Sequence, residues 1–244
     1  MSGTSHRTLW IVTALLIAIP AMGLLFRNAL ATLAATHVLA RQALVCDSVQ
    51  ARVPFALPPI QIELAPMHCR SKAGPLQSIH FAAPLHVDLG SGHIAAVRCA
   101  TATLALRAQP HREVELNTLG DLTALVGLDE PAVELMFDAA YLAERPTLPL
   151  RVANVTVLRD GRPLAMLTEL QVLPLPDGLS LAARSLRAGQ ISALGAASLY
   201  ATASPGHARA VLKYPSRLRI TVIAEHLDAP KPSVRFEIAH GAGS

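Results

Sequence analysis

Alternating hydrophobic and polar residues dominate the chain from about residue 48 onward, for example along Val49–Phe55 and Ile79–Leu89. Successive side chains of a half-buried strand point to opposite faces of a sheet, so this pattern predicts strands. Asp160-Gly161, between two aliphatic runs, is the strongest hairpin signal, and a face change at Ala153–Asn154 predicts a bulge. Residues 48–240 are therefore predicted to form one mainly β domain, an antiparallel sheet that is either curved or folded into a sandwich.

Two segments have helical rather than strand spacing. Residues 27–47 contain neither glycine nor proline and place Leu30 and Leu33 near helical spacing. They are predicted to form a helical extension, which serves either as a spacer or as a helix for a partner or a membrane interface. Within the β domain, a stripe of leucines followed by Gly127 predicts one packed helix over residues 117–127.

Residues 8–26 form a long apolar run without a charged side chain. A helix of this length spans about 30 Å, which matches the hydrocarbon core of a bilayer. The alternative is a cleaved signal peptide, because small residues at Ala29 and Ala31 could offer a cleavage site. We expect a retained transmembrane anchor behind a cytoplasmic tail of residues 1–7.

The orientation of this anchor rests on several signals that disagree. Arg7 precedes the run, whereas Arg27 and Arg41 follow it, so the positive-inside rule does not favour a cytoplasmic N-terminus. Short N-terminal tails normally stay in the cytoplasm, however, and the body carries three cysteines and strand-type patterning. We therefore expect an inner-membrane protein of a Gram-negative bacterium with its body in the periplasm, ending in a disordered tail, residues 241–244.

The composition excludes several classes of protein. Hydrophobic residues make up 52% and charged residues 16% of the chain, which favours a sizeable core over disorder. Aromatic residues make up only 4%, and the basic residues behind the net charge of +4 are scattered singly. A nucleic-acid partner is not expected, because such a partner requires basic residues clustered on one face.

The three cysteines are Cys46, Cys69 and Cys99. In an oxidising compartment two of them would pair and leave one thiol free. Cys46 and Cys69 are the favoured disulfide pair, with a Cys69–Cys99 bridge and no bridge as the open alternatives. Cys99 falls in the middle of a predicted strand, where a small buried side chain is ordinary.

No motif for catalysis, a cofactor or a metal is found. His68, His80, His86 and His93 have no spacing typical of metal ligands along the chain, and solvated strand histidines are the expected interpretation. A nucleophile elbow and a glycine-rich phosphate loop are both missing from the sequence, and the acidic residues form no recognisable pair. The chain is predicted not to be an enzyme.

Three segments follow the apolar run and share an aliphatic strand-turn-strand texture: LPPIQIELAPMHC (57–69), APLHVDLGSGHIAAVRCATATLALRA (83–108) and LPLRVANVTVLRDGRPLAML (148–167). This arrangement resembles the AsmA-like and type II secretion protein N-like proteins of Gram-negative envelopes. The resemblance covers about half the chain and carries no functional residue. It implies an anchored, long curved sheet that either handles lipid between membranes or supports an envelope machine.

Two functions of different class follow from these expectations. A chain without site chemistry acts through its surfaces, which favours a structural or assembly subunit with protein partners in an envelope complex. The alternative is the binding or transfer of lipid, or of another apolar ligand, along an uncovered face of a curved sheet. Period-two patterning does not distinguish a curved sheet from a sandwich, so both functions stay open at this point.

Overall fold

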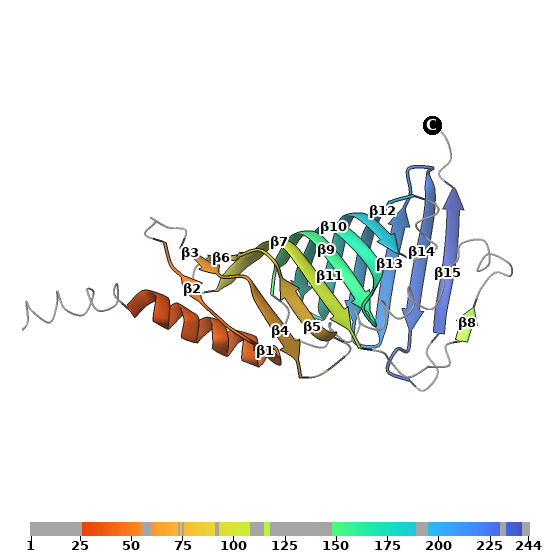
Figure 1. The fold of residues 1–244 in the computed structure, drawn as a ribbon. Helices are drawn as coiled ribbons and strands as arrows, with labels where there is room; N and C mark the ends of the chain where they lie inside the picture. Colours follow the sequence, from red (N-terminus) through yellow and green to blue (C-terminus); the bar gives the residue numbers. More distant parts are fainter. Residues whose placement is uncertain are drawn as a thin grey trace, which may run out of the picture.

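A computed structural model describes residues 26–54, 60–72, 74, 76–90, 93–107, 115–117, 148–188, 195–229 and 233–240. Within these residues a helix, residues 26–41, leads into a single 15-stranded sheet that twists and curves along its length (Figure 1). The strands are β1 (Leu44–Cys46), β2 (Ala51–Arg52), β3 (Gln61–Leu64), β4 (Met67–Ser71), β5 (Leu76–Phe81), β6 (Leu85–Leu89), β7 (Ile94–Leu106), β8 (Glu115–Asn117), β9 (Leu150–Arg159), β10 (Arg162–Leu175), β11 (Gly178–Ala188), β12 (Ala197–Ser204), β13 (His207–Lys213), β14 (Leu218–Glu225) and β15 (Ser233–His240). The mainly β prediction is confirmed, as a curved sheet.

The sheet is mixed, which corrects the expectation of a purely antiparallel one. β7 pairs with β9 in parallel, and β15 pairs with β8 in parallel at the far edge, whereas the other pairs are antiparallel. A parallel pair requires a crossover connection, and residues 107–149 supply the one between β7 and β9. From β9 to β15 the chain is an antiparallel meander in sequence order.

Strands β1 to β7 build a meander of four long strands. Three of these long strands are each interrupted once and so count as two short ones: β1 with β2, β3 with β4, and β5 with β6; the fourth is β7. β1 and β2 pair with β4 and β3 respectively, and these pair in turn with β5 and β6, both of which lie along β7. Pro66 separates β3 from β4, and Pro84 lies between β5 and β6. Proline has no N–H for the ladder, so these two strands break close to their prolines, whereas the break between β1 and β2 contains none.

These breaks belong to a crease that continues across the neighbouring strands. At the crease most of these strands change the parity of the residues that point toward the core, as the buried positions of β9 show on either side of Ala153 and Asn154. The strand made of β5 and β6 keeps its parity, since three residues separate the buried Phe81 and Leu85. The face change predicted at Ala153 and Asn154 is confirmed, but the predicted bulge is not, because the register of β9 with β7 and β10 is the same on both sides of them and the register shift of this hairpin lies between Pro163 and Ala165. The positions on the crease are residues 47–50, 65–66, 82–84, 100–101, 153–154, 168–169 and 184–185.

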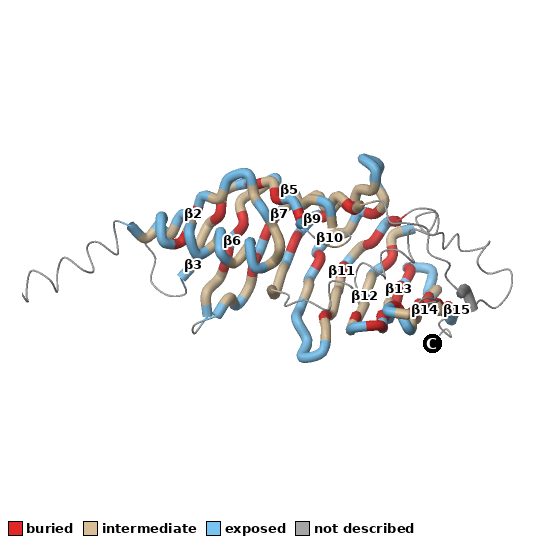
Figure 2. The backbone as a smooth tube through the Cα atoms, turned by 90° about the horizontal axis from the view of Figure 1, so that it is seen from below, coloured by how far each residue is buried: buried red, intermediate tan, exposed pale blue. Residues whose placement is uncertain are grey.

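The core lies mainly on one face of the sheet, and buried positions alternate with more exposed ones along the strands (Figure 2). Leu179, Ile220 and Val234 have at most 1% of their surface exposed. Toward the β12–β13 hairpin the core-facing positions are alanines: Ala201 pairs with Ala210, and Ala203 with Ala208. Small side chains there leave room for the sheet to curl toward its apolar face.

The helix packs on the sheet through Ala31, Ala35 and Leu39, which join the hydrophobic core. Its polar side chains also cover the free edge of β2, because Thr32 Oγ1 accepts the Ala51 N–H at 2.9 Å and Asn28 Oδ1 accepts the Val53 N–H at 2.9 Å. Unpaired edge groups are otherwise a template for aggregation. The helix is thereby fixed to the sheet along one side.

The helical extension ends earlier than predicted, at residue 41 rather than 47, and β1 begins at Leu44. The reason is Ala43, whose φ of 57° is the left-handed conformation that usually falls to glycine after a helix. The Ala43 N–H donates to the Ala40 carbonyl at 3.0 Å and closes the last turn. No sequence signal marks this end, since alanine ordinarily favours a helix.

Three predictions lie wholly or mostly outside the described residues: the anchor over residues 8–26, the packed helix over 117–127 and the tail over 241–244. Asn117, the first residue of that predicted helix, belongs instead to β8. Among the residues that the structure places, no helical segment combines the length and the hydropathy that a bilayer crossing requires.

Candidate functional site

The two cysteines favoured by the sequence are joined in the structure. Cys46 on β1 lies directly opposite Cys69 on β4, with the sulfur atoms 2.04 Å apart and the Cα atoms 3.9 Å apart. The next pair along, Asp47 and His68, shares a backbone hydrogen bond of 3.0 Å from the Asp47 N–H to the His68 carbonyl. Cys46 and Cys69 therefore occupy a non-hydrogen-bonded position, where opposite side chains of antiparallel strands come closest.

Cys99 is free and buried on β7, so the structure does not contain the alternative Cys69–Cys99 bridge. Burial raises the pKa of its thiol, although hydrogen bonds with the backbone at Thr101 and Ala83 act in the opposite direction. A buried thiol with a raised pKa is a poor nucleophile. Cys99 thus serves as a small core residue, as the sequence predicted.

The helix carries a second apolar stripe that does not face the sheet. Phe26, Leu30 and Leu33 are spaced four and three residues apart, so they share one side of the helix. Their exposed fractions are 56%, 59% and 72%. Since Ala31, Ala35 and Leu39 hold the opposite side against the sheet, this outward stripe has a fixed direction relative to the body.

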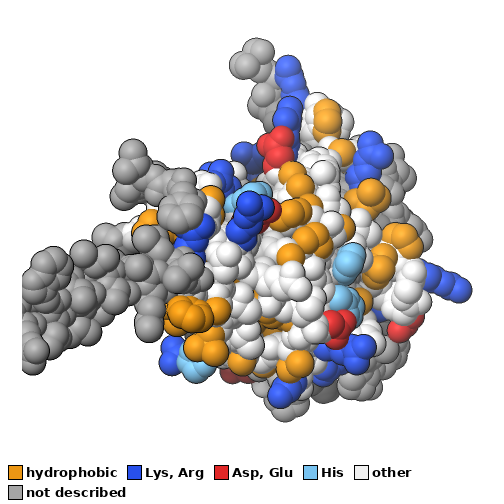
Figure 3. Space-filling view, turned by 60° about the vertical axis from the view of Figure 1, so that its left-hand side comes forward, with side chains coloured by type: hydrophobic (Ala, Val, Ile, Leu, Met, Phe, Trp, Pro, Cys, Tyr) orange, Lys and Arg blue, Asp and Glu red, His pale blue; other side chains and the backbone are white. Residues whose placement is uncertain are grey.

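Elsewhere, exposed apolar residues are spread over the outer face of the sheet and the β10–β11 hairpin. Met166 on β10 and Tyr200 on β12 point outward, and Leu173 and Leu175 lie near the hairpin tip. On the face shown in Figure 3, the basic side chains are scattered among hydrophobic ones and do not form a broad basic surface. This distribution gives no support for a nucleic-acid interface.

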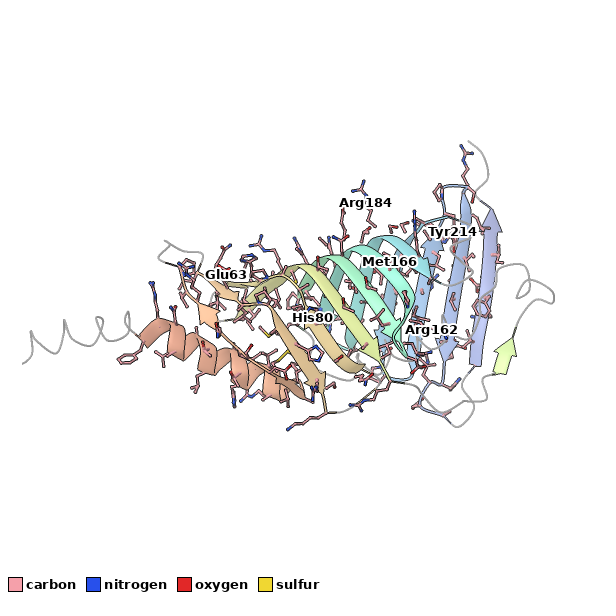
Figure 4. The ribbon with its side chains drawn as sticks, viewed as in Figure 1. Glu63, His80, Arg162, Met166, Arg184 and Tyr214 are labelled. Carbon is pink, nitrogen blue, oxygen red and sulfur yellow. A yellow bond between two sulfur atoms is a disulfide. The ribbon has the colours of Figure 1, made fainter. Side chains whose placement is uncertain are left out.

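The charged side chains of the outer face form small solvated pairs. Asp88 accepts hydrogen bonds from Arg98 at 2.8 Å and from Gln61 at 3.0 Å. Arg184 binds Glu169 at 2.9 Å, and the Arg184 side chain points away from the sheet (Figure 4). An exposed ion pair contributes at most about 1 kcal/mol to stability, so these are ordinary surface salt bridges and do not define a reactive site.

Two histidine pairs were missed by sequence reasoning. His68 on β4 lies opposite His80 on β5 with ring centroids 6.0 Å apart, and His207 lies 6.1 Å from His226. The predicted outward orientation of His80 and His86 is confirmed, because both are exposed on their strands. Within the described part of the chain, no group of three or more metal-binding side chains is assembled. Spacing along the sequence could not reveal these pairs, because strand register creates them.

One buried polar atom stands out on the core face. Tyr214, at the end of β13, is only 5% exposed, and its hydroxyl has no hydrogen-bond partner. Burial accordingly raises the pKa of this phenol. A buried hydroxyl without a partner loses its bonds to water and gains nothing in return, so it destabilises the fold.

We therefore expect Tyr214→Phe to raise the free energy of unfolding by about 1 kcal/mol, because the substitution removes the unpaired hydroxyl and keeps the ring. Urea titration of the purified protein, followed by circular dichroism, measures this change. Tyr200→Phe is the matched control, since Tyr200 is 55% exposed and no change is therefore expected. A loss of stability in Tyr214→Phe would show that the hydroxyl has a partner in solution.

No protein-family model matches this chain, and no curated protein or solved structure is significantly similar to it.

Proposed function

We propose that this protein is a non-enzymatic structural or assembly subunit of a bacterial envelope complex, anchored in the inner membrane with its body in the periplasm. The observation that carries this proposal is the outward stripe of Phe26, Leu30 and Leu33 on a helix fixed to the sheet. This helix directly continues the apolar run of residues 8–26. Large apolar side chains that share an exposed helix face are typical of a surface for a partner helix.

The way the helix is held supports a docking role over that of a flexible spacer. Asn28 and Thr32 bind the edge of β2, and the chain re-enters the sheet three residues after the helix ends, at Leu44. The disulfide then joins β1 to β4. A partner bound to the stripe would therefore position the whole sheet, and little conformational entropy would be lost on binding because the helix is already ordered.

The burial of the apolar side chains on the core face of the sheet weighs against the lipid alternative. Lipid binding along the sheet requires aliphatic side chains that nothing else covers. On the core face, Ile220, Ala224 and Val234 are fully buried, and Leu179 is 1% exposed. Side chains that are already buried offer no further apolar surface to a ligand, so the assembly role ranks first.

The test is a double substitution on the stripe, Leu30→Gln with Leu33→Gln. Glutamine has almost the helix propensity of leucine, and both side chains are exposed, so the fold should be retained. The full-length variant and the wild type are each extracted from their own membranes in mild detergent. We expect the amount of co-purifying protein subunits to be at least tenfold lower with the variant.

Met166→Gln with Tyr200→Gln is the matched control, because these residues are also more than half exposed but lie on the outer face of the sheet. The control should keep its partners. If the stripe variant kept them as well, while circular dichroism showed both variants folded, the stripe would not be the docking surface. Loss of partners in the control variant alone would show that partners bind the outer face of the sheet and not the stripe.

A further inference from the structure

The pair His68–His80 lies in a rigid part of the sheet, next to the disulfide. His68 shares a hydrogen-bonded position with Asp47 on β1, so toward β5 it occupies a non-hydrogen-bonded position. At such positions the Cα atoms are about 4.5 Å apart and the side chains lie close together. Both residues alternate with buried neighbours along their strands, so they lie on the solvent-facing side, where His80 is exposed and His68 is half-buried. His80 is labelled in Figure 4.

The geometry of the two rings suits a shared ligand. Their centroids are 6.0 Å apart and their planes are inclined by 43°. A metal ion binds imidazole nitrogen at about 2.0–2.1 Å, which allows two ring centroids on one ion to be up to about 6.4 Å apart. That limit applies when the two nitrogens lie on opposite sides of the ion, and at a tetrahedral angle the centroids are about 5.2 Å apart. Rotations of the side chains are therefore required to bring both imidazoles onto a single ion.

The surrounding charges are balanced. Asp47 lies beside His68 in the same cross-strand row and supplies a carboxylate, whereas Arg70, two residues further along β4, supplies a positive charge on the same face. Thr103 on β7 is the neighbour of His80 on its other side. The row thus offers two imidazoles as ligands, and water would supply the remaining ones.

We propose that His68 and His80 form a binding site for one divalent transition-metal ion of the zinc or copper class, completed by water and assisted by the charge of Asp47. Imidazole is a preferred ligand of both metals. Bound there, the ion would tie β4 to β5 as the disulfide ties β1 to β4, and so stiffen the end of the sheet that carries the docking helix. This site goes beyond the proposed assembly function and does not depend on it.

The test is calorimetric titration of Zn²⁺ into the full-length protein in detergent, without reductant and without a histidine tag. We expect one saturable site, with affinity reduced at least tenfold in His68→Gln and in His80→Gln, and no further reduction in the double variant. The same protein loaded with one Cu²⁺ should show two nitrogen ligands by electron paramagnetic resonance.

His207→Gln is the matched control, because it disrupts the other histidine pair, in which His226 lies at a backbone φ of 58° beyond the end of a strand. This variant should keep the wild-type affinity. Equal affinity in the wild type and in the folded His68→Gln and His80→Gln variants would overturn the proposal. So would a loss of the saturable site in His207→Gln.

Discussion

Replacing Ile220 by alanine is expected to lower the free energy of unfolding by about 4 kcal/mol, within the range measured for large-to-small substitutions in cores. Ile220 is 0% exposed on β14 and lies between Leu212 on β13 and Ile238 on β15. Truncation would remove three methyl or methylene groups from water-free surroundings and leave a cavity that neighbouring strands cannot close. Urea titration of the wild type and the variant measures the difference.

Ile223→Ala provides the matched control for this prediction. Ile223 is the same residue type on the same strand, but it has opposite parity and is half-buried on the outer face. Its truncation should lower the free energy of unfolding by only about 1 kcal/mol, because a half-buried side chain takes less apolar surface out of water and leaves little cavity when it is removed. Equal losses at the two positions would contradict the assignment of the core to one face of the sheet.

Removal of the Cys46–Cys69 bridge has the second largest expected effect. The bridge closes a loop with a sequence separation of 23, and the chain-entropy model assigns such a cross-link about 3 kcal/mol. The variant Cys46→Ser with Cys69→Ser should therefore unfold at clearly lower urea concentration than the oxidised wild type. Mass mapping of peptides from the non-reduced protein should recover residues 46 and 69 in one disulfide-linked fragment.

A reducing agent separates this effect from other consequences of substitution. It should destabilise the wild type and Cys99→Ala alike, because both contain the bridge, and it should leave the double serine variant unchanged. If the reducing agent had no effect on the wild type, the disulfide would not contribute to stability. If Cys99→Ala became insensitive to it, Cys99 would be part of the bridge.

The local features of this fold were predictable because each has a local cause. Alternation along Leu218–Val222 identifies β14, and Asp160-Gly161 adopts positive φ angles of 49° and 73° in the two-residue hairpin loop between β9 and β10. Asparagine, aspartate and glycine tolerate this conformation best, which is why the pair is a strong signal. The Cys46–Cys69 pairing could be favoured, but the sequence alone did not exclude the alternatives.

The long-range features had no comparable signal. The parallel pairing of β7 with β9 depends on how residues 107–149 cross over, which periodicity does not encode. The crease is visible in one strand as the face change at Ala153–Asn154, but its alignment across neighbouring strands depends on register. The His68–His80 pair arises in the same way, from two residues that are twelve positions apart in the chain.

Native mass spectrometry of the full-length protein, extracted from its own membranes in mild detergent, tests the central proposal most directly. We expect complexes that contain additional protein subunits and no bound lipid, and we expect Leu30→Gln with Leu33→Gln to reduce them to the free chain. A monomer that carries stoichiometric lipid in both the wild type and the stripe variant would contradict an assembly role and identify the protein as a lipid-binding one.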